Sequence, residues 1–311
     1  MTRLTCGFLF LSMLAFAPAM THAAEGKGAT YATPEEAAKN HDFVIQGEYT
    51  AEGKGLQVLA LGEGKFRLIA FKGGLPGAGW DGKEKSAVEG DADKVLEVLS
   101  ESKFESVERK SDTLGAKAPE GAIVLFDGTK ETLEKHWKPG TKMTEDGLLE
   151  QGAHGITNAE DFQIHIEFRL PFMPDARGQG RGNSGYYVCG RYEIQMLDSF
   201  GLEGLDNECG GIYQASRPAV NMCLPPLAWQ TYDVDFTAPK FDADGKKTSN
   251  AVVTVKHNGV VIHDQLELKK PTPGGVSGDE KNGAGPVFLQ NHGNPVRYRN
   301  IWMLPKSATK P

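Results

Sequence analysis

The chain has 311 residues, a formal net charge of −7 and an ordinary apolar content of 39%. Its 34 Lys and Arg residues are outnumbered by 41 Asp and Glu residues, and no Lys/Arg cluster interrupts the negative balance. A nucleic-acid partner is therefore not expected, because phosphate binding needs a positive field. The contents of Gly (38) and Pro (17) are high and favour many turns between short strands.

The first 24 residues have the layout of a secretory signal peptide. Arg3 gives a positive start, Phe8–Ala17 is a short apolar run, and the small residues of Pro18–Ala24 offer a cleavage point after Ala23 or Ala24. The apolar run is too short to span a bilayer stably, and no later stretch is long and apolar enough to do so. We therefore expect a secreted or periplasmic protein without stable membrane insertion.

Residues 25–118 are expected to form a small accessory domain that ends in a linker around Ala116–Gly121. Its expected strands are Phe43–Thr50, Gly55–Leu61 and Lys65–Phe71, and its expected helix is Asp91–Leu99. A glycine-rich loop, Gly73–Trp80, lies between the last strand and the helix. No Lys-Ser/Thr pair and no helical pattern follow this loop directly, so it is not interpreted as a phosphate-binding loop.

Residues 122–305 show the alternation typical of half-buried antiparallel strands. Phe162–Leu170 places five apolar residues on one face and four polar residues on the other. Asn258-Gly259 lies between two apolar runs and predicts a hairpin with a type I′ turn. Further strands are expected at Tyr232–Phe236, Pro286–Gln290 and Val296–Met303. Many short strands without crossover helices predict a mainly β fold, a β-sandwich.

Three cysteines follow the predicted signal peptide: Cys189, Cys209 and Cys223. Cys209 and Cys223 lie 14 residues apart in loop-like sequence, and export favours a disulfide between them, with Cys189 left free. Three unpaired thiols remain the alternative, because connectivity cannot be read from a sequence.

The strand expected at Arg191–Asp198 carries the first candidate site residues. Glu193 and Gln195 point to one face, about 7 Å apart, together with Leu197. Asp198 would lie on the opposite face unless a bulge turns it back. Asn183 and Tyr187 precede this strand and could join the same site. The plain alternative is a strand with a solvated outer face.

Two later stretches supply further candidates. Tyr213, Asn221 and Trp229 could contact a sugar, because aromatic rings stack on pyranoses and amides bond to hydroxyls, although a buried Trp is more often part of a core. Gln290 and His292 follow a strand, and His292 could act as an acid or base or be an ordinary turn histidine. Arg297 and Arg299 share a strand face and could hold an oxyanion or a carboxylate.

These stretches together resemble the 3-keto-disaccharide hydrolase family. The resemblance covers about residues 122–305 and is carried by Leu125-Phe126-Asp127-Gly128, Asn183-Ser184-Gly185, the EIQMLD strand at 193–198, Gly211-Ile212-Tyr213, the Asn258-Gly259 turn, Leu289–Gly293 and Arg297–Ile301. It implies a concanavalin-A-like jelly-roll sandwich and activity on glycosides already oxidised at the sugar C3. It does not cover residues 25–120.

On this reading the 3-keto group acidifies the hydrogen at C2. The C1–O glycosidic bond then breaks by elimination, the aglycone leaves, and water adds to the sugar. The hypothesis assigns Glu193 as base, His292 or Asp198 as acid, and Arg297 with Asn183 as oxyanion donors. Gln195, Tyr213 and Gln290 would hold hydroxyl groups. Three rivals stay open: a carbohydrate-binding module without catalysis, a lyase that stops at the eliminated product, and a glycosidase using Glu193 and Asp198, with carboxylates about 5–5.5 Å apart for retention.

No cofactor is expected from the sequence. His165, His257 and His263 lack the spacing of a metal site and are interpreted as strand histidines. The acidic loop Asp242-Ala243-Asp244-Gly245 could hold a structural calcium. The expected partner is therefore a carbohydrate, as a small molecule or a glycan.

Overall fold

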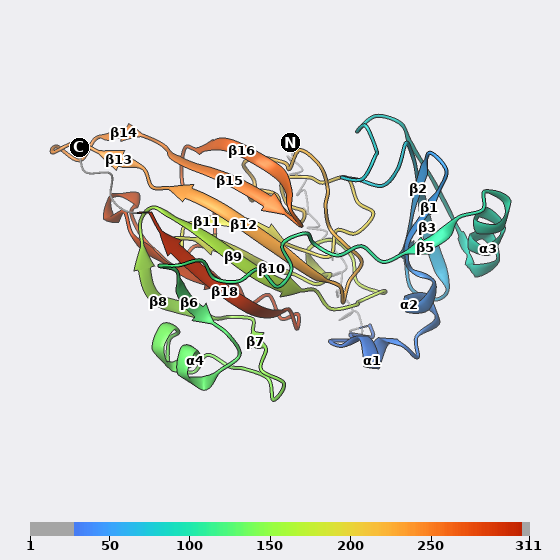
Figure 1. Ribbon diagram of the computed structural model, residues 1–311, viewed down its shortest axis with the longest axis horizontal. Coiled ribbons are helices and arrows are strands. Elements are labelled where there is room, and N and C mark those ends of the chain that lie inside the picture. Colours follow the sequence, from blue (N-terminus) through green and yellow to red (C-terminus); the bar gives the residue numbers. More distant parts are fainter. Residues whose placement is uncertain (1–27, 307–311) are drawn as a thin grey trace, which may run out of the picture.

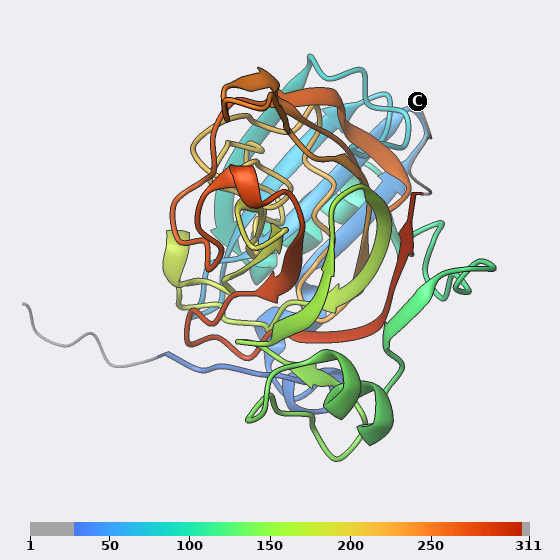
Figure 2. The ribbon, with the colours of Figure 1, turned by 90° about the vertical axis from the view of Figure 1, so that its left-hand side faces the viewer.

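The computed structural model describes residues 28–306, so the predicted signal peptide lies outside the described residues. The chain forms an N-terminal five-stranded sheet followed by a sandwich of two antiparallel sheets. The N-terminal sheet lies at one end of the elongated molecule (Figure 1), and its strands stand behind the sandwich in the end-on view (Figure 2). Within residues 28–306, no helix is both long and apolar enough to cross a bilayer.

The N-terminal sheet is antiparallel, with the order β4-β3-β2-β1-β5. Its strands are β1 (Gly47–Ala51), β2 (Lys54–Ala60), β3 (Lys65–Lys72), β4 (Lys85–Asp91) and β5 (Glu105–Val107), and its helices are α1 (Pro34–Ala37), α2 (His41–Ile45) and α3 (Ala92–Glu101). Helix α3 confirms the predicted helix, and Asp91 caps it by accepting from the Lys94 N–H.

The strand predicted at Phe43–Thr50 is wrong over its first half, because helix α2 occupies residues 41–45. The side chain of Asn40 accepts from the backbone N–H groups of Asp42 and Phe43 at 2.9 and 3.3 Å and starts the helix. Such a cap satisfies two of the N–H groups that a first helical turn leaves unpaired. This local signal outweighs the apolar run that suggested a strand.

The sandwich begins at Ile123 and runs to Pro305. One sheet has the order β11-β10-β17-β8, and the other has the order β16-β15-β12-β9-β18-β6 with β7 beside β18. The first consists of β8 (His154–Ala159), β10 (Ser184–Val188), β11 (Tyr192–Met196) and β17 (Gly285–Leu289). The second consists of β6 (Ile123–Phe126), β7 (Leu149–Glu150), β9 (Phe162–Arg169), β12 (Trp229–Thr237), β15 (Ala251–His257), β16 (Val260–Leu268) and β18 (Arg297–Pro305).

The loops of the sandwich contain smaller elements: α4 (Lys130–His136), the two-stranded sheet of β13 (Lys240–Phe241) and β14 (Lys247–Ser249), and the 3₁₀ turns at Gly178–Gly180 and Glu280–Asn282. The predicted hairpin is confirmed, with Asn258 and Gly259 both at positive φ, 53° and 84°. A type I′ turn requires positive φ at both of these positions. The mainly β jelly-roll sandwich expected from the sequence is the fold that the structure has.

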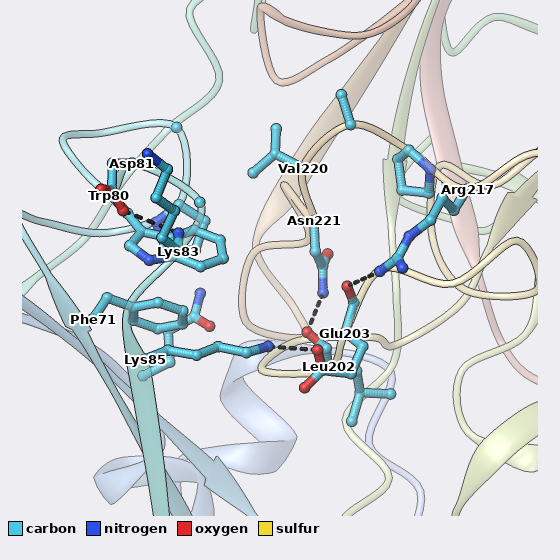
Figure 3. Close-up of a pocket in the computed structure, with 16 residues that line it drawn as sticks. Phe71, Trp80, Asp81, Lys83, Lys85, Leu202, Glu203, Arg217, Val220 and Asn221 are labelled. Atoms are coloured by element: carbon cyan, nitrogen blue, oxygen red, sulfur yellow. Dashed lines mark hydrogen bonds and ion pairs between the residues drawn. The ribbon is translucent and has the colours of Figure 1, made fainter.

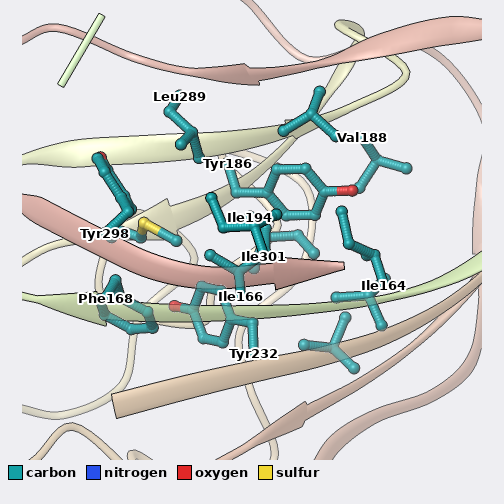
Figure 4. Close-up of a cluster of buried hydrophobic side chains, with 14 of the residues drawn as sticks. Ile164, Ile166, Phe168, Tyr186, Val188, Ile194, Tyr232, Leu289, Tyr298 and Ile301 are labelled. Atoms are coloured by element: carbon teal, nitrogen blue, oxygen red, sulfur yellow. The ribbon is translucent and has the colours of Figure 1, made fainter. Parts of the chain in front are cut away.

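The core lies between the two sheets (Figure 4). From the four-stranded sheet it receives Tyr186, Val188, Ile194 and Leu289, and from the seven-stranded sheet Ile164, Ile166, Phe168, Tyr232, Tyr298 and Ile301. Each large apolar side chain buried here contributes about 1.5–3 kcal/mol. Because side chains alternate along a strand, the inward Tyr186 and Ile194 force Tyr187 and Glu193 to the opposite face of their sheet.

The N-terminal sheet packs directly against the sandwich. Leu59, Ile69 and Phe71 point from β2 and β3 into the apolar cluster that also contains the sandwich core. A Cβ at Gly201, in a sandwich loop, would lie 3.1 Å from Ile69 and 3.4 Å from Leu59, so this loop touches the sheet. The contact fixes how the N-terminal sheet sits on the sandwich.

Residues 108–122 connect the two parts and cross the outer face of the seven-stranded sheet. Thr113 donates its hydroxyl to Asp233 at 2.6 Å and shares a hydrogen bond with Thr231 at 2.8 Å. Further along, the Ala116 carbonyl accepts from the Asn300 amide and the Trp302 indole. The segment predicted as a linker is therefore anchored along its length on the sandwich surface.

Replacing Thr113 by Val should lower the free energy of unfolding by about 1–3 kcal/mol, because Asp233 and Thr231 lose a partly buried hydrogen-bond partner. Urea denaturation followed by circular dichroism measures the change. Thr141→Val is the matched control, since that hydroxyl only donates to the Lys138 carbonyl at the surface, and it should change stability by less than about 0.5 kcal/mol. Equal effects of the two changes would mean that the segment is only a tether.

Candidate functional site

Strands β10 and β11 bring the first candidate residues together on the outer face of the four-stranded sheet. In their antiparallel register Tyr187 lies opposite Glu193, and Gly185 lies opposite Gln195. The predicted shared face of Glu193 and Gln195 is thus present. This face is not the solvated surface of the plain alternative, because Glu193 is 2% exposed and Gln195 is 1% exposed.

Gly185 makes room for the carboxylate of Glu193. A Cβ built at Gly185 would overlap Glu193 Oε1 and lie 2.9 Å from its carboxyl carbon, Cδ. Any larger residue would push Glu193 out of its position above the sheet. This close approach gives a physical reason for glycine in the Asn183-Ser184-Gly185 stretch.

A pocket of about 120 Å³ opens above Glu193. Its walls contain seven of the residues that the sequence predicted, namely Asn183, Tyr187, Glu193, Gln195, Tyr213, Gln290 and His292. Three further wall residues were missed: Gln179, Pro273 and Gly274. Gln179 lies in a 3₁₀ turn and the other two in the loop before β17, and no motif in these loops connects them to the strand of Glu193.

Glu193 is the single carboxylate among the residues that line this pocket. Burial raises its pKa to about 7, and the hydrogen bond from Tyr187 offsets part of that rise. Within residues 28–306, no Lys, Arg or His forms an ion pair with it. Near neutral pH the carboxyl is thus present in both protonation states, as a general acid–base group requires.

Tyr187 connects Glu193 to two further groups. Its hydroxyl lies 2.8 Å from Glu193 Oε2 and 3.0 Å from the Pro273 carbonyl, both of which are acceptors, while Gln290 Nε2 donates to it at 3.2 Å. Burial raises the pKa of Tyr187, so the hydroxyl keeps its proton. One proton faces two acceptors: it can point to Glu193 when that group is ionised and to Pro273 when Glu193 carries a proton.

Gly274 allows the approach of the Pro273 carbonyl. Its φ is +83°, and a Cβ there would lie 2.5 Å from the Tyr187 hydroxyl oxygen. A residue with a side chain would be strained and would displace Tyr187. The loop before β17 is therefore part of the site, although it is far from Glu193 in the sequence.

A cluster of amides forms the other wall. Gln179 Oε1 accepts from Asn183 Nδ2 at 3.2 Å and from Gln195 Nε2 at 3.0 Å, and Gln179 Nε2 donates to the Asn207 carbonyl at 2.8 Å. Asn183 Oδ1 is buried and has no hydrogen-bond partner among the described residues. Because the Asn183 amide nitrogen is already bonded to Gln179, the polar atom that this side chain leaves unpaired is an acceptor. The predicted role of Asn183 as an oxyanion donor does not fit this geometry.

Asp198, predicted as an acid, lies outside the pocket. It follows the end of β11, is 2% exposed, and forms an ion pair with Arg181 at 2.7 Å. Arg181 also donates to the Ala60 carbonyl of β2, so the pair joins the N-terminal sheet to the strand that carries Glu193. The strand does not bulge to return Asp198 to the pocket face. A retaining glycosidase with these two carboxylates is therefore not supported.

Four other predicted contacts also lie elsewhere. Arg297 and Arg299 are on the seven-stranded sheet, where Tyr298 points inward and the arginines point outward, bonded to Gln151 and Glu167 respectively. Trp229 lies on the same outer face, with the Arg299 guanidinium 4.0 Å from its ring. Asn221 donates to the Ser199 and Leu202 carbonyls and lines a different cleft. Sequence could not show which of the two sheets each strand joins.

The predicted Cys209–Cys223 disulfide is wrong, because all three cysteines of the described chain are buried free thiols. The Cys209 thiol lies 3.2 Å from the Tyr232 hydroxyl, and the Cys223 thiol donates to the Leu197 carbonyl at 3.6 Å. The Cys209 and Cys223 thiols also lie in hydrogen-bonding contact with each other, so the two residues are neighbours without being bonded covalently. Burial raises the pKa of Cys189 to about 12, which leaves it an unreactive thiol.

The described residues contain no group of three His, Cys, Asp or Glu side chains that could hold a metal ion. In the acidic loop suggested for calcium, Asp242 Oδ1 accepts from the backbone N–H groups of Asp244 and Lys246. His257 bonds to the Gln230 side chain and His263 to the Gly210 carbonyl, whereas His165 lies between Asp233 and Glu167. Each of the three histidines thus contacts polar groups of the fold.

The fold is a jelly-roll β-sandwich, and its four-stranded sheet carries a pocket of amides and hydroxyls around one carboxyl. Residues 121–304 match the family model of the 3-keto-alpha-glucoside-1,2-lyase-like domain, and the chain belongs to this family. The match confirms the resemblance seen in the sequence. A carbohydrate-related function follows from it.

The chain is also similar to solved structures. The chain is similar to a candidate glycosyl hydrolase from Parabacteroides distasonis ATCC 8503, with 34% identity and a TM-score of 0.54, over 61% of this chain and 85% of that one. A second candidate glycosyl hydrolase from the same organism has 19% identity and a TM-score of 0.43, over 60% and 95% of the two chains. No curated protein matches the chain.

Replacing Tyr187 by Phe should raise the pKa of Glu193 above its value of about 7, because the hydrogen bond that stabilises the carboxylate is removed. A carbon-13 NMR titration of the Glu193 carboxyl measures it. Tyr213→Phe is the control, because Tyr213 lines the pocket but does not bond to the carboxylate. This change should leave the pKa of Glu193 unchanged. A fall or no change in Tyr187→Phe would contradict the assigned contact.

The raised pKa also predicts how stability depends on pH. A carboxyl whose pKa rises from 4.5 to about 7 on folding contributes stability that is complete below about pH 4.5 and lost as the pH rises through about 7. At pH 8 the loss amounts to about 3 kcal/mol. Glu193→Gln should therefore be more stable than the wild type at pH 8 and similar to it at pH 4.5, as measured by urea denaturation at both values.

The matched control is Glu145→Gln, which removes a carboxylate from the surface and should change stability little at either pH. A Glu193→Gln protein that is less stable than the wild type at pH 8 would show that the carboxylate is stabilised by its surroundings, contrary to the raised pKa.

Proposed function

We propose that the protein cleaves glycosides that already carry a keto group at C3 of the sugar, by removal of the C2 proton. The observation that carries this proposal is a single buried carboxyl, Glu193, with a pKa of about 7, in a pocket whose other polar groups are amides and hydroxyls. Double displacement at C1 needs a second carboxylate, and none lines this pocket. Proton abstraction next to a ketone needs one base and donors for the enolate oxygen.

The reaction balances as an elimination followed by hydration. Ionised Glu193 takes the C2 proton, the electron pair of that C–H bond forms the enolate with the C3 carbonyl, and its collapse breaks the C1–O bond. The leaving oxygen takes a proton, for which His292 at the pocket rim is the candidate donor. Water then adds its hydroxyl to C1 and a proton returns to C2, so the sum is hydrolysis.

Tyr187 and Gln290 replace Arg297 as the proposed donors to the enolate. When Glu193 takes the C2 proton, it no longer needs the hydrogen bond from Tyr187, and that hydroxyl can turn to the new oxyanion or to Pro273. Gln290 Nε2 lies beside the same hydroxyl and supports it. Donors that are in place before charge develops are the arrangement that lowers such barriers most.

The small volume of the pocket fits one sugar ring better than a chain, so the leaving group would extend outside it. Asn183 Oδ1 and Gln195 would hold hydroxyls of the ring, and Tyr213 would contact it from the side. With the signal peptide predicted at residues 1–24, we propose that the reaction takes place outside the cytoplasm.

Glu193→Gln should lower kcat on a 3-keto-glucoside by about 10²–10⁴-fold with little change in KM, because a base contributes about that factor. The measurement is release of the aglycone from the 3-keto-glucoside and from the unoxidised glucoside. The wild type should cleave only the oxidised compound, and its kcat/KM should rise as the pH rises through about 7. Glu145→Gln, a surface change, should keep wild-type turnover.

Other results would contradict the proposal in different ways. Equal turnover of both glucosides would mean an ordinary glycosidase, and wild-type turnover in Glu193→Gln would remove this residue from the mechanism. Binding of both sugars without aglycone release would support a carbohydrate-binding module. An unsaturated sugar that accumulates as the final product would place the protein among lyases.

A further inference from the structure

A second and larger cleft lies between the N-terminal sheet and the sandwich, with a volume of about 590 Å³ (Figure 3). It shares no lining residue with the pocket around Glu193. One wall comes from the glycine-rich loop and from β3 and β4, and the other from sandwich loops at residues 202–203 and 217–221. Small-molecule sites are commonly of this size and lie between domains.

The glycine-rich loop, which has no role in the pocket, presents Trp80 to this cleft. The two ends of this loop are in backbone contact, because a Cβ at Gly73 would lie 2.6 Å from the Gly79 carbonyl oxygen. The Trp80 indole donates to the Glu84 carbonyl at 3.1 Å, and its ring packs on Phe71 with centroids 5.0 Å apart. The ring is only partly buried, and Lys85 Nζ lies over it at 6.0 Å from its centroid, so a ligand would meet a fixed aromatic ring beside a cation.

The facing wall is polar and equally fixed. Arg217 donates to the backbone carbonyls of Glu203 and Gly204, and Asn221 donates to those of Ser199 and Leu202. Lys85 of β4 forms an ion pair with Glu203 at 2.6 Å and so joins the two walls (Figure 3). A ligand in the cleft would meet groups that already hold their positions, which reduces the entropy lost on binding.

The charges of the lining leave an excess of positive groups. The lining contains three basic side chains, Lys83, Lys85 and Arg217, and two acidic ones, Asp81 and Glu203. The Glu203 carboxylate is bonded to Lys85, and Asp81 Oδ1 accepts from the backbone N–H of Lys83. Within residues 28–306, the side chains of Lys83 and Arg217 have no carboxylate partner. Both are therefore available to an anionic group.

We propose that this cleft is a second carbohydrate site, which binds an acidic oligosaccharide containing uronate residues. A sugar ring would stack on Trp80, and carboxylates of the oligosaccharide would bind Lys83 on one wall and Arg217 on the facing wall (Figure 3), since guanidinium groups bind carboxylates well. The site binds and does not cleave, so it is independent of the proposed reaction. The segment from Tyr213 to Arg217 links a wall of the catalytic pocket to a wall of this cleft.

The test is calorimetric titration of the Glu193→Gln protein with trigalacturonate, and with the neutral trisaccharide maltotriose as comparison. Binding of trigalacturonate should be at least tenfold tighter than binding of maltotriose and should weaken with added salt. Trp80→Ala should abolish it, and the double change Lys83→Met with Arg217→Met should weaken it about tenfold. Lys130→Met, an exposed lysine on the sandwich, is the matched control and should bind like the parent.

Because Trp80 packs on Phe71, Trp80→Phe is included as a variant that keeps an aromatic ring; it should retain part of the affinity and the parent melting temperature. No binding of trigalacturonate by the parent, or the same binding in Trp80→Ala and the double variant, would overturn the proposal. Equal affinity for the neutral trisaccharide would overturn the choice of acidic sugars. None of these results depends on turnover of a 3-keto-glucoside, so the two proposals can fail separately.

Discussion

The cross-strand pair of Tyr187 and Glu193 is the contact on which the site depends. The register of β10 and β11 places the two residues opposite each other, and the inward side chains on either side of them fix that register in the core. Burial makes the carboxylate costly, and the Tyr187 hydroxyl is the group that offsets part of the cost. If the register of β11 against β10 shifted by one residue, Glu193 would point into the core and the pocket would lose its carboxyl group.

Both faces of strands β10 and β11 are buried, although only one belongs to the sandwich core. The outer face is covered by the turn at Gln179, the loop at Pro273-Gly274 and the segment around Tyr213, which form the walls of the pocket. The segment at residues 199–221 also meets the N-terminal sheet, and the Arg181–Asp198 ion pair ties that sheet to the end of β11. The N-terminal part of the chain therefore supports the position of the site, and through its glycine-rich loop it forms the proposed second one.

Period-two alternation predicts the sandwich and the shared face of Glu193 and Gln195, and the Asn-Gly turn signal predicts the hairpin at Asn258-Gly259. Alternation does not show which sheet a strand joins, so the prediction that Arg297, Arg299 and Trp229 contact the substrate is wrong, because they lie on the seven-stranded sheet. Asp198 follows the end of β11, where alternation alone allows a bulge, and its ion pair with Arg181 could not be predicted from the sequence.

The loop residues Gln179, Pro273 and Gly274 carry no periodic signal, so only the folded chain brings them to Glu193. The cysteine spacing was compatible with a disulfide, but spacing does not fix the environment of each thiol.

Removal of a proton from C2 is the central claim, and it can be observed on the sugar itself. The measurement is proton NMR of the 3-keto sugar released from a 3-keto-glucoside by the enzyme in D₂O, corrected for the exchange seen without enzyme. The account predicts deuterium at C2 of the product in step with aglycone release, because the abstracted proton is replaced from solvent. A product that keeps its original hydrogen at C2 would contradict it and would point to direct displacement at C1.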